Sequence, residues 1–334
     1  MMSSTGEIYN ALLQEIQKKT LAPNEIINKK YTCMNGIGLI YSIFSGIRMR
    51  ALAIPADKTL YEGQFPVWKG VKIELASLPE YDDPSQLYVI LQQMPGTEAY
   101  IFEIVAEDLR RTVEKMISSN SIMDAVLNVL TKWRVFFSSG RIPVLTASEA
   151  QGLYGELMFL KELLLRFGAN AVNAWYGEKN THDFYIGQHA VEVKTSDKQA
   201  PYYAHINSEY QLDDSDVNGH LYLKMYALRS DRSGGQRLPA LIKMIRDLLR
   251  LDEAVLSIFD EKLEAEGYLD AAEDYYSNGY TVRDTYLFEV RSGFPRLIKK
   301  DIPKGIYHIE YDVSVSEGMN CAVEDDEFFR KLEE

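Results

Sequence analysis

The segment Asn180–Thr195 constrains the fold more than any other part of the chain. Two short, largely apolar stretches flank a Gly187-Gln188 turn, and this arrangement predicts a β-hairpin. The valines of its second arm point to one face, so the two-residue period of a strand places Glu192 and Lys194 together on the other face. Asp183 belongs to the first arm. The hairpin therefore brings two carboxylates and a lysine to one place.

This combination of side chains suits metal-assisted hydrolysis of a phosphodiester bond. Carboxylate oxygens are hard ligands that hold Mg²⁺, and the ion polarises a phosphoryl oxygen and acidifies a bound water. A neighbouring lysine orients that water or stabilises the charge that develops. The structural alternative is an ion pair between Glu192 and Lys194 on an edge strand, with Asp183 as a turn-forming residue.

A fourth candidate, Glu156, lies on a helix predicted over Glu149–Phe167. Thr146 to Glu149 have the form of the capping box that opens such a helix. Leucines three residues before Glu156 and four and seven residues after it share its face, so the carboxylate projects from the apolar stripe. A buried acid needs a partner, which would be a metal ion or a buried lysine or arginine. An interdomain salt bridge is the structural alternative.

Composition narrows the classes of protein and of metal site. The chain has 334 residues, 46% hydrophobic and 25% charged, which is typical of a soluble globular protein of about two domains. Two distant cysteines form neither a disulfide framework nor a zinc site, so a metal would use oxygen ligands, with or without a histidine. The histidines lack ligand spacing on one helix, and a structural role is the simpler interpretation of His182, His189, His205 and His220.

No segment predicts a membrane span or an export signal. The longest uncharged run, residues 31–47, contains polar residues and glycines and is shorter than the roughly 20 mostly apolar residues that a spanning helix needs. The N-terminus is charged where a secretion signal would be apolar. A cytoplasmic protein without a membrane partner is therefore expected.

The formal charge of −13 is unevenly distributed. Residues 310–334 carry nine acids and two bases, whereas residues 291–304 carry five cations and one acid. A second basic stretch surrounds Gly234-Gly235. These basic stretches fit either a surface for a polyanion or ordinary solvated loops. The candidate DNA-binding cations are Lys198, Arg229, Arg232, Arg237, Arg296, Lys299 and Lys300.

The order of predicted elements indicates two domains. Residues 1–117 form a small α+β accessory domain, with strands predicted over 38–44, 47–54, 71–75, 87–91 and 99–104 and a helix from Asp108. Residues 118–334 form the domain that carries the chemistry, and a helix over 121–137 links the two. The acidic end, from about 310 to 334, is expected to be a flexible tail or a contact for a basic partner.

The candidate residues resemble the signature of the PD-(D/E)XK nuclease superfamily, in which a helical acid precedes an Asp and a Glu-x-Lys on a hairpin. More narrowly, the chain is similar to a PD-(D/E)XK-motif family of bacterial proteins often encoded beside restriction or phage-defence genes. This likeness is carried by Trp133, Gly152–Leu157, His182-Asp183, Glu192–Thr195, Ser208–Leu212, Phe294-Pro295 and Tyr311. One departure is His182, which stands where the superfamily signature has proline.

The resemblance implies a fold, a substrate and a cofactor. The fold is an α/β (α+β) domain with a restriction-endonuclease-like mixed sheet flanked by helices. DNA is the implied substrate, and Mg²⁺ the cofactor, with Mn²⁺ as a substitute. Asp183, Glu192 and the backbone carbonyl of Val193 would be metal ligands, Lys194 the catalytic lysine and Glu156 an auxiliary acid.

Three residues after the Glu-x-Lys strand are auxiliary candidates. His205, Ser208 and Gln211 would position a phosphate or the nucleophilic water, or they would form a turn and a helix cap. The Glu-x-Lys triplet is not specific by itself, because a carboxylate-x-lysine triplet is expected about once by chance in such a chain. Asp260-Glu261-Lys262 is a second match, in a predicted helix. The preceding Asp, the apolar strand and the acid-bearing helix distinguish the hairpin.

The leading hypothesis is a cytoplasmic, Mg²⁺-dependent DNA endonuclease of a bacterial restriction or phage-defence system. One site cuts one strand, so cleavage of a duplex would need two copies or two binding events, and a homodimer is a secondary prediction. One alternative is a non-catalytic subunit that binds nucleic acid or a partner protein on a nuclease-like fold. Another is a nuclease that is active only with a defence-system partner such as an ATPase or a methyltransferase.

Overall fold

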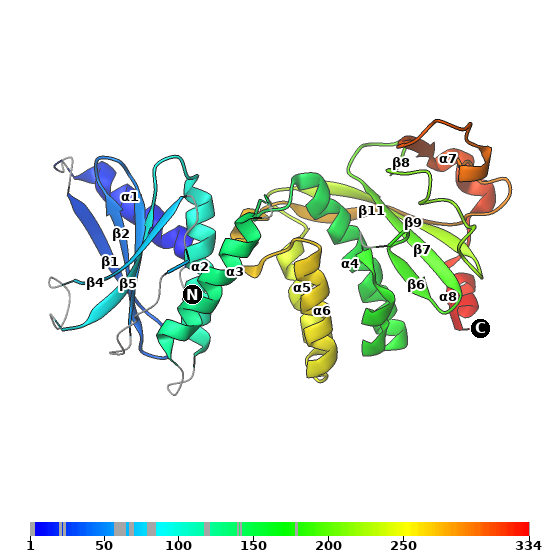
Figure 1. Cartoon of the computed structure of the whole chain (residues 1–334). Helices are drawn as coiled ribbons and strands as arrows, with labels where there is room; N and C mark the ends of the chain where they lie inside the picture. The colour runs from blue at the N-terminus through cyan, green and yellow to red at the C-terminus, as the bar shows by residue number, and fades with distance from the viewer. Residues whose placement is uncertain are drawn as a thin grey trace. The chain divides into compact units, whose positions relative to one another are not determined.

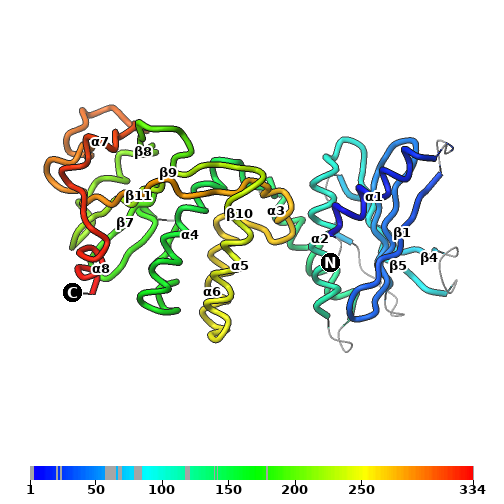
Figure 2. Tube along the Cα trace, turned by 180° about the vertical axis from the view of Figure 1, so that it is seen from behind, coloured from blue at the N-terminus to red at the C-terminus, as the bar shows by residue number. Residues whose placement is uncertain are grey.

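The computed structural model describes residues 4–19, 22, 25–56, 65–66, 70–78, 85–116, 121–138, 140, 142–177 and 180–333 (Figures 1 and 2). The chain divides into two compact units. The first comprises residues 1–143 and 270–274, and the second comprises residues 144–269 and 275–334. Within the described ranges, no helix has both the length and the apolar content that crossing a membrane requires.

The first unit is an antiparallel sheet with helices, in the strand order β1-β2-β3-β5-β4. Helix α1 contacts β1, β2 and α2, and these elements lie together in Figure 1. The bounds are α1 Thr5–Lys18, β1 Ile26–Thr32, β2 Gly38–Phe44, β3 Arg50–Pro55, β4 Val71–Ser77, β5 Leu87–Gln93, α2 Ala99–Lys115 and α3 Ile122–Ser138. The hairpin expected over 38–54 is confirmed as β2 and β3.

The strand expected over 99–104 is wrong, because those residues form the first turns of α2. Phe102, Val105, Leu109 and Val113 are all fully buried. They recur every three or four residues, which is the spacing of one helical face. Burial of one helical face therefore stabilises this apolar run as a helix, although its aromatic and β-branched residues favour a strand locally.

Helix α3 belongs to the first unit. It packs against α2, and the indole nitrogen of Trp133 donates to Asp108 Oδ2 at 2.8 Å. The unit therefore ends later in the chain than the predicted boundary between residues 117 and 118, which itself lies outside the described residues.

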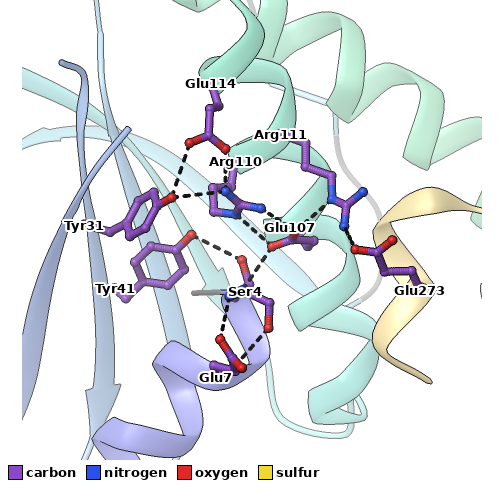
Figure 3. A network of polar contacts seen from close by, with 10 residues as sticks. Ser4, Glu7, Tyr31, Tyr41, Glu107, Arg110, Arg111, Glu114 and Glu273 are labelled. Atoms are coloured by element: carbon purple, nitrogen blue, oxygen red, sulfur yellow. Dashed lines mark hydrogen bonds and ion pairs between the residues drawn. The ribbon is translucent and has the colours of Figure 1, made fainter. Parts of the chain in front are cut away.

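A buried ionic network ties α2 to the N-terminus of α1 (Figure 3). Arg110 contacts Glu107 at 2.7 Å and Glu114 at 2.6 Å, and all three side chains are almost completely buried. Glu107 Oε2 also accepts the backbone N–H of Thr5 at 3.0 Å. Arg111 joins the network through Glu107. Burial alone would raise the pKa of Glu107, but the hydrogen bonds and charges of the two arginines lower it to about 2.

Acidification is therefore expected to destabilise the first unit through Glu107. A carboxyl whose pKa is depressed on folding stabilises the protein above its unfolded value, here 4.5, and that contribution is lost as the pH falls toward 2. A shift of this size corresponds to about 3 kcal/mol. The measurement is the denaturant unfolding of this unit at pH 5 and pH 2 in the wild type and in Glu107→Gln. The variant should have a lower free energy of unfolding at pH 5, and this free energy should fall less on acidification than in the wild type. Equal losses would contradict the assignment.

The second unit contains a mixed sheet in the order β10-β11-β9-β7-β6. Strands β7 and β9 are parallel, and the other neighbours are antiparallel. The bounds are α4 Ala147–Phe167, β6 Phe184–Ile186, β7 His189–Ser196, β8 Tyr203–Ile206, β9 Leu221–Asp231, β10 Gln236–Arg237, α5 Leu238–Leu249, α6 Glu253–Ala265, β11 Gly279–Glu289, β12 Tyr311–Ser314, α7 Val315–Gly318 and α8 Asp325–Glu333. The expected α+β class, with a mixed sheet and flanking helices, is confirmed.

The two faces of this sheet are covered by different elements. On one face Tyr226 donates to Glu162 of α4 at 2.8 Å, and the ring of Tyr222 packs on Phe328 of α8. The opposite face packs against the small β8–β12 sheet, in a core that includes Ala190, Leu223, Met225, Ile206 and Val313. Alternation along β7 places Glu192 and Lys194 on this second face, because Glu192 lies opposite Leu223 in the register.

The flexible tail expected at the acidic end is not observed, because the described residues from 310 to 333 are folded. Strand β12 pairs with β8, and the side chain of Phe328 in α8 is fully buried. Asp325 at the start of α8 contacts the buried Lys224 at 3.1 Å. Figure 2 shows α8 lying beside this part of the sheet. The apolar side chains of this acidic segment bury enough surface to order it, which its charge alone did not indicate.

Candidate active site

The hairpin of β6 and β7 positions Asp183. The two strands pair antiparallel, with Phe184 opposite Val191, and β7 lies inside the sheet between β6 and β9. Asp183 immediately precedes β6, and its Oδ2 accepts the backbone N–H of Val193 at 2.7 Å. This bond holds the carboxylate beside the strand that carries the Glu-x-Lys triplet. The edge-strand alternative fails, because β7 has a neighbour on each side.

Glu192 and Lys194 form a buried ion pair. Lys194 Nζ lies 2.8 Å from Glu192 Oε1, and Glu192 is only 1% exposed. Burial and then the charge of Asp183 raise the pKa of Glu192 to about 8, although Lys194 opposes this shift. Burial would lower the pKa of Lys194, but the charges of Glu192, Asp183 and Glu156 raise it. The lysine therefore remains a cation among three acids.

Glu156 on α4 interacts electrostatically with Asp183 and Glu192. Its Oε2 accepts a hydrogen bond from the indole nitrogen of Trp175 at 2.7 Å. Burial and the charge of Asp183 raise its pKa well above the ordinary value. Its described partner is thus a neutral donor within the second unit rather than a lysine or an arginine, and the metal ion that the sequence offered as the other partner stays a prediction. The tryptophan lies 19 residues further along the chain, and no spacing rule connects it to Glu156.

Gly155 allows α4 to approach β7 closely. A Cβ atom at this position would lie 2.3 Å from Thr195 Cγ2, which is far inside van der Waals contact. A larger residue would therefore push the helix, and Glu156 with it, away from the strand. The glycine next to Glu156 is part of the geometry that brings the helical acid to the hairpin.

The donor set fits a divalent cation in charge and in chemistry. Burial, and after it the charge of Asp183, raises the pKa values of both Glu156 and Glu192, and Lys194 offsets only part of the shift at Glu192. Carboxylate oxygens are the donors that Mg²⁺ and Mn²⁺ prefer. In the part of the chain that the structure describes, no three His, Cys, Asp or Glu side chains are arranged to bind a metal by themselves. The carboxylates would thus be supplemented by other donors.

His182 is a buried neighbour of this group that the sequence did not single out as functional. It is 1% exposed, with Nδ1 at 3.9 Å from Glu192 Oε2 and Nε2 at 3.6 Å from Asp216 Oδ1. Neither ring nitrogen has a hydrogen-bond partner among the described residues. The available signal was its place beside Asp183, where the superfamily signature has proline.

The auxiliary candidates make local contacts. Ser208 Oγ accepts the backbone N–H of Tyr210, and Gln211 Oε1 accepts that of Asn207. His205 lies on β8, and its Nδ1 is 2.8 Å from Asp312 Oδ1 on β12. These contacts are those of the turn-forming alternative. A role of the three residues in holding a phosphate or a water stays a prediction.

The candidate DNA-binding cations are distributed over three regions. Arg229, Arg232 and Arg237 are exposed around the end of β9 and the start of β10. Lys198 follows β7 and is exposed. Arg296 bonds to Leu212 O and Asp214, and so has a structural role in its loop. Lys299 lies over the ring of Tyr210, with Nζ 5.0 Å from its centroid, and Lys300 is exposed.

The second carboxylate-x-lysine match, Asp260-Glu261-Lys262, is called the decoy triplet. It lies on a helix, whereas the triplet of the candidate site lies on a strand. Asp260, Glu261 and Lys262 lie on α6, and Lys262 Nζ donates to the backbone carbonyls of Val172 and Trp175. A helix cannot place the first and third residues on one face as a strand does. The strand and helix contexts expected for the two triplets are therefore confirmed, and a catalytic role for the hairpin triplet stays a prediction.

The mixed sheet, the acid-bearing helix and the hairpin with its buried lysine define a nuclease-like α+β protein. A comparison with protein families agrees, because the family described as "Putative PD-(D/E)XK family member, (DUF4420)" matches residues 48–316. The chain belongs to this family, and the resemblance drawn from the sequence is confirmed. Comparisons with curated proteins and with solved structures gave no match.

Proposed function

We propose that the protein is a metal-dependent nuclease that hydrolyses phosphodiester bonds in DNA. The observation that carries the proposal is the convergence of Asp183 and Glu192 with Lys194, inside the sheet of a family member. Burial and then the charge of Asp183 raise the pKa of Glu192 to about 8, and this cost of holding the carboxylates charged supports a divalent cation as an additional counter-charge. Mg²⁺ is the proposed cofactor, and Mn²⁺ would substitute for it.

Each residue has a distinct role in this proposal. Asp183, Glu192 and the backbone carbonyl of Val193 would hold the cation, which supplies Lewis-acid activation of the phosphoryl group and of a water. Lys194 would orient the attacking water and stabilise the charge that develops on the phosphoryl oxygens. Glu156, held by Trp175, would act as an auxiliary acid that adjusts the charge around the site. Surrounding side chains exclude bulk water from Glu192.

We further propose a bacterial restriction or phage-defence system as the biological setting, with DNA as substrate and a homodimer for cleavage of both strands. The burial of Glu192 favours one variant of this proposal, a nuclease that becomes active only with a partner such as an ATPase or a methyltransferase. A carboxylate that is 1% exposed must gain access to the cation and substrate before catalysis. Partner binding would provide that opening.

The test is cleavage of supercoiled plasmid by the purified chain with Mg²⁺, Mn²⁺ or EDTA. We expect nicking with either ion and none with EDTA, and a loss of at least about 100-fold in Lys194→Ala, because that variant lacks the charge that stabilises the transition state. The matched control is Asp260→Asn in the decoy triplet, which removes only a surface pair with Arg246.

The outcomes separate the alternatives. Metal-independent cleavage, or cleavage unaffected by Lys194→Ala, would contradict the proposed site. Absence of cleavage by the chain alone, followed by cleavage when a partner is added, would identify the partner-dependent nuclease. DNA binding that is unchanged by metal and by substitution of Asp183 would instead support a non-catalytic binding subunit.

A further inference from the structure

Residues 175–177, here called the bridging segment, bond to two acids of the candidate site. The indole nitrogen of Trp175 donates to Glu156 Oε2 at 2.7 Å. The backbone N–H of Tyr176 donates to the carbonyl oxygen of Asp183 at 2.8 Å. The first acid comes from helix α4 and the second from the hairpin of β6 and β7. One short segment therefore contacts the helical acid and the hairpin acid together.

Lys262 on α6 holds the bridging segment. Its Nζ donates to the backbone carbonyl of Trp175 and, at 3.1 Å, to that of Val172. The same ammonium group lies over the ring of Tyr176, 5.1 Å from the ring centroid. A charged donor forms hydrogen bonds roughly twice as strong as those of a neutral donor. The lysine of the decoy triplet therefore ties α6 to the bridging segment.

Packing places the bridging segment between the hairpin and α6. Trp175 and Phe184 are both almost completely buried and form an isolated antiparallel bridge. The indole also packs against Phe259 of α6, with 6.0 Å between the ring centroids. Gly177 has a φ of 60°, which favours glycine, and a Cβ atom there would overlap with the carboxylate of Glu266. Loss of the contact with α6 would therefore move the indole that bonds to the helical acid.

We infer that Lys262 is a positioning residue, which sets the places of Glu156 and Asp183 through the bridging segment. The inference rests on the proposed function, since both acids belong to the same site. Placement matters for catalysis, because a displacement of about 1 Å caused far from the reacting atoms can cost about 100-fold in rate. Lys262 donates to backbone carbonyls, so its removal should change the geometry of the acids and leave the binding of DNA unchanged.

The first test follows the indole of Trp175 in the full-length protein by ¹⁵N nuclear magnetic resonance. The chain has three tryptophans, and the resonance that Trp175→Phe removes belongs to this indole. Glu156→Leu deletes the acceptor and gives the position of the resonance without the hydrogen bond. In Lys262→Met the resonance should move toward that position, because methionine cannot hold the bridging segment. In Asp260→Asn, on the same helix, it should keep its wild-type position.

The second test is the kinetics of plasmid nicking with Mg²⁺, with rates normalised to the folded fraction by circular dichroism. We expect kcat of Lys262→Met to fall about 10- to 100-fold, while KM for DNA keeps its wild-type value. Trp175→Phe keeps an aromatic ring and the backbone carbonyl but removes the donor to Glu156. It should therefore show the same loss of kcat at constant KM, even if Lys262→Met does not fold.

Three results would overturn the inference and leave the nuclease proposal standing. They are an indole resonance that keeps its wild-type position in Lys262→Met, a wild-type kcat in Lys262→Met or Trp175→Phe, and a rise in KM without loss of kcat, which would mean that Lys262 contacts DNA directly. Absence of cleavage by the wild type would count against the nuclease. The indole resonance of Lys262→Met then decides alone: a shift retains the positioning of Glu156, and an unchanged position overturns it.

Discussion

Asp183→Asn is expected to reduce metal-dependent DNA cleavage by about 1000-fold or more without unfolding the protein. The asparagine carbonyl can still accept the Val193 N–H that Asp183 Oδ2 accepts at 2.7 Å, so the hairpin should keep its geometry. The substitution removes the negative charge that would hold the cation. Loss of a catalytic metal interaction costs several kcal/mol, and about 4 kcal/mol corresponds to about 1000-fold in rate.

The measurement is the initial rate of plasmid nicking at saturating Mg²⁺, together with circular dichroism to check the fold. Asp183→Ala serves as a comparison, because it removes the charge and also leaves the Val193 N–H without this acceptor. If the asparagine variant cleaves at the wild-type rate, the carboxylate is not a metal ligand and the proposed mechanism fails. If only the alanine variant loses activity, Asp183 acts through hairpin geometry.

Arg110→Ala is expected to lower the free energy of unfolding of the first unit by about 3–5 kcal/mol. The arginine contacts Glu107 and Glu114, whose side chains are only 6% and 9% exposed (Figure 3). Removing Arg110 takes from Glu114 the cation that it contacts in this network and leaves Arg111 as the cation beside Glu107, and loss of a buried ion-pair partner accounts for a cost of this size. The link to the N-terminal turn of α1 would also be affected, because the carboxylate of Glu107 accepts the backbone N–H of Thr5.

Hydrogen exchange of the α2 amides in denaturant would report on this unit alone. The matched control is Arg111→Ala, whose side chain is 25% exposed and whose removal leaves Arg110 in contact with Glu107. We expect the control to be clearly milder. Equal losses in the two variants, or a loss of less than about 1 kcal/mol in Arg110→Ala, would show that the network contributes little to stability.

Local patterns in the sequence were sufficient for several elements. The hairpin of β6 and β7, helix α4 and the pairing of Glu192 with Lys194 follow from periods of two and 3.6 residues and from turn and capping residues. These features depend on neighbours within a few positions. The strand prediction for Ala99–Ile104 was wrong because local patterns were not sufficient there. Its apolar run is compatible with a strand or a helix, and only burial on one helical face selects the helix.

Charge was the least reliable guide to order. The acidic end predicted a flexible tail or a contact for a basic partner, and the structure shows a folded segment in which Phe328 of α8 packs against Tyr222 and Phe159 of α4. The buried Lys224 lies between Glu162 of α4 at 3.3 Å and Asp325 of α8 at 3.1 Å. These partners are far apart in the chain, so a count of charges within one segment could not reveal them.

The sequence by itself selected the residues that we propose to carry the chemistry, because Asp183, Glu192 and Lys194 are held by one hairpin and Glu156 by one helical stripe. Tertiary structure decided which atoms meet. The indole of Trp175 on Glu156 and the carboxylate of Asp216 near His182 are set by packing between segments that local periodicity does not connect. The physical reason is the range of each interaction: backbone periodicity acts over one turn or one strand, whereas burial and electrostatic pairing depend on how the whole unit closes.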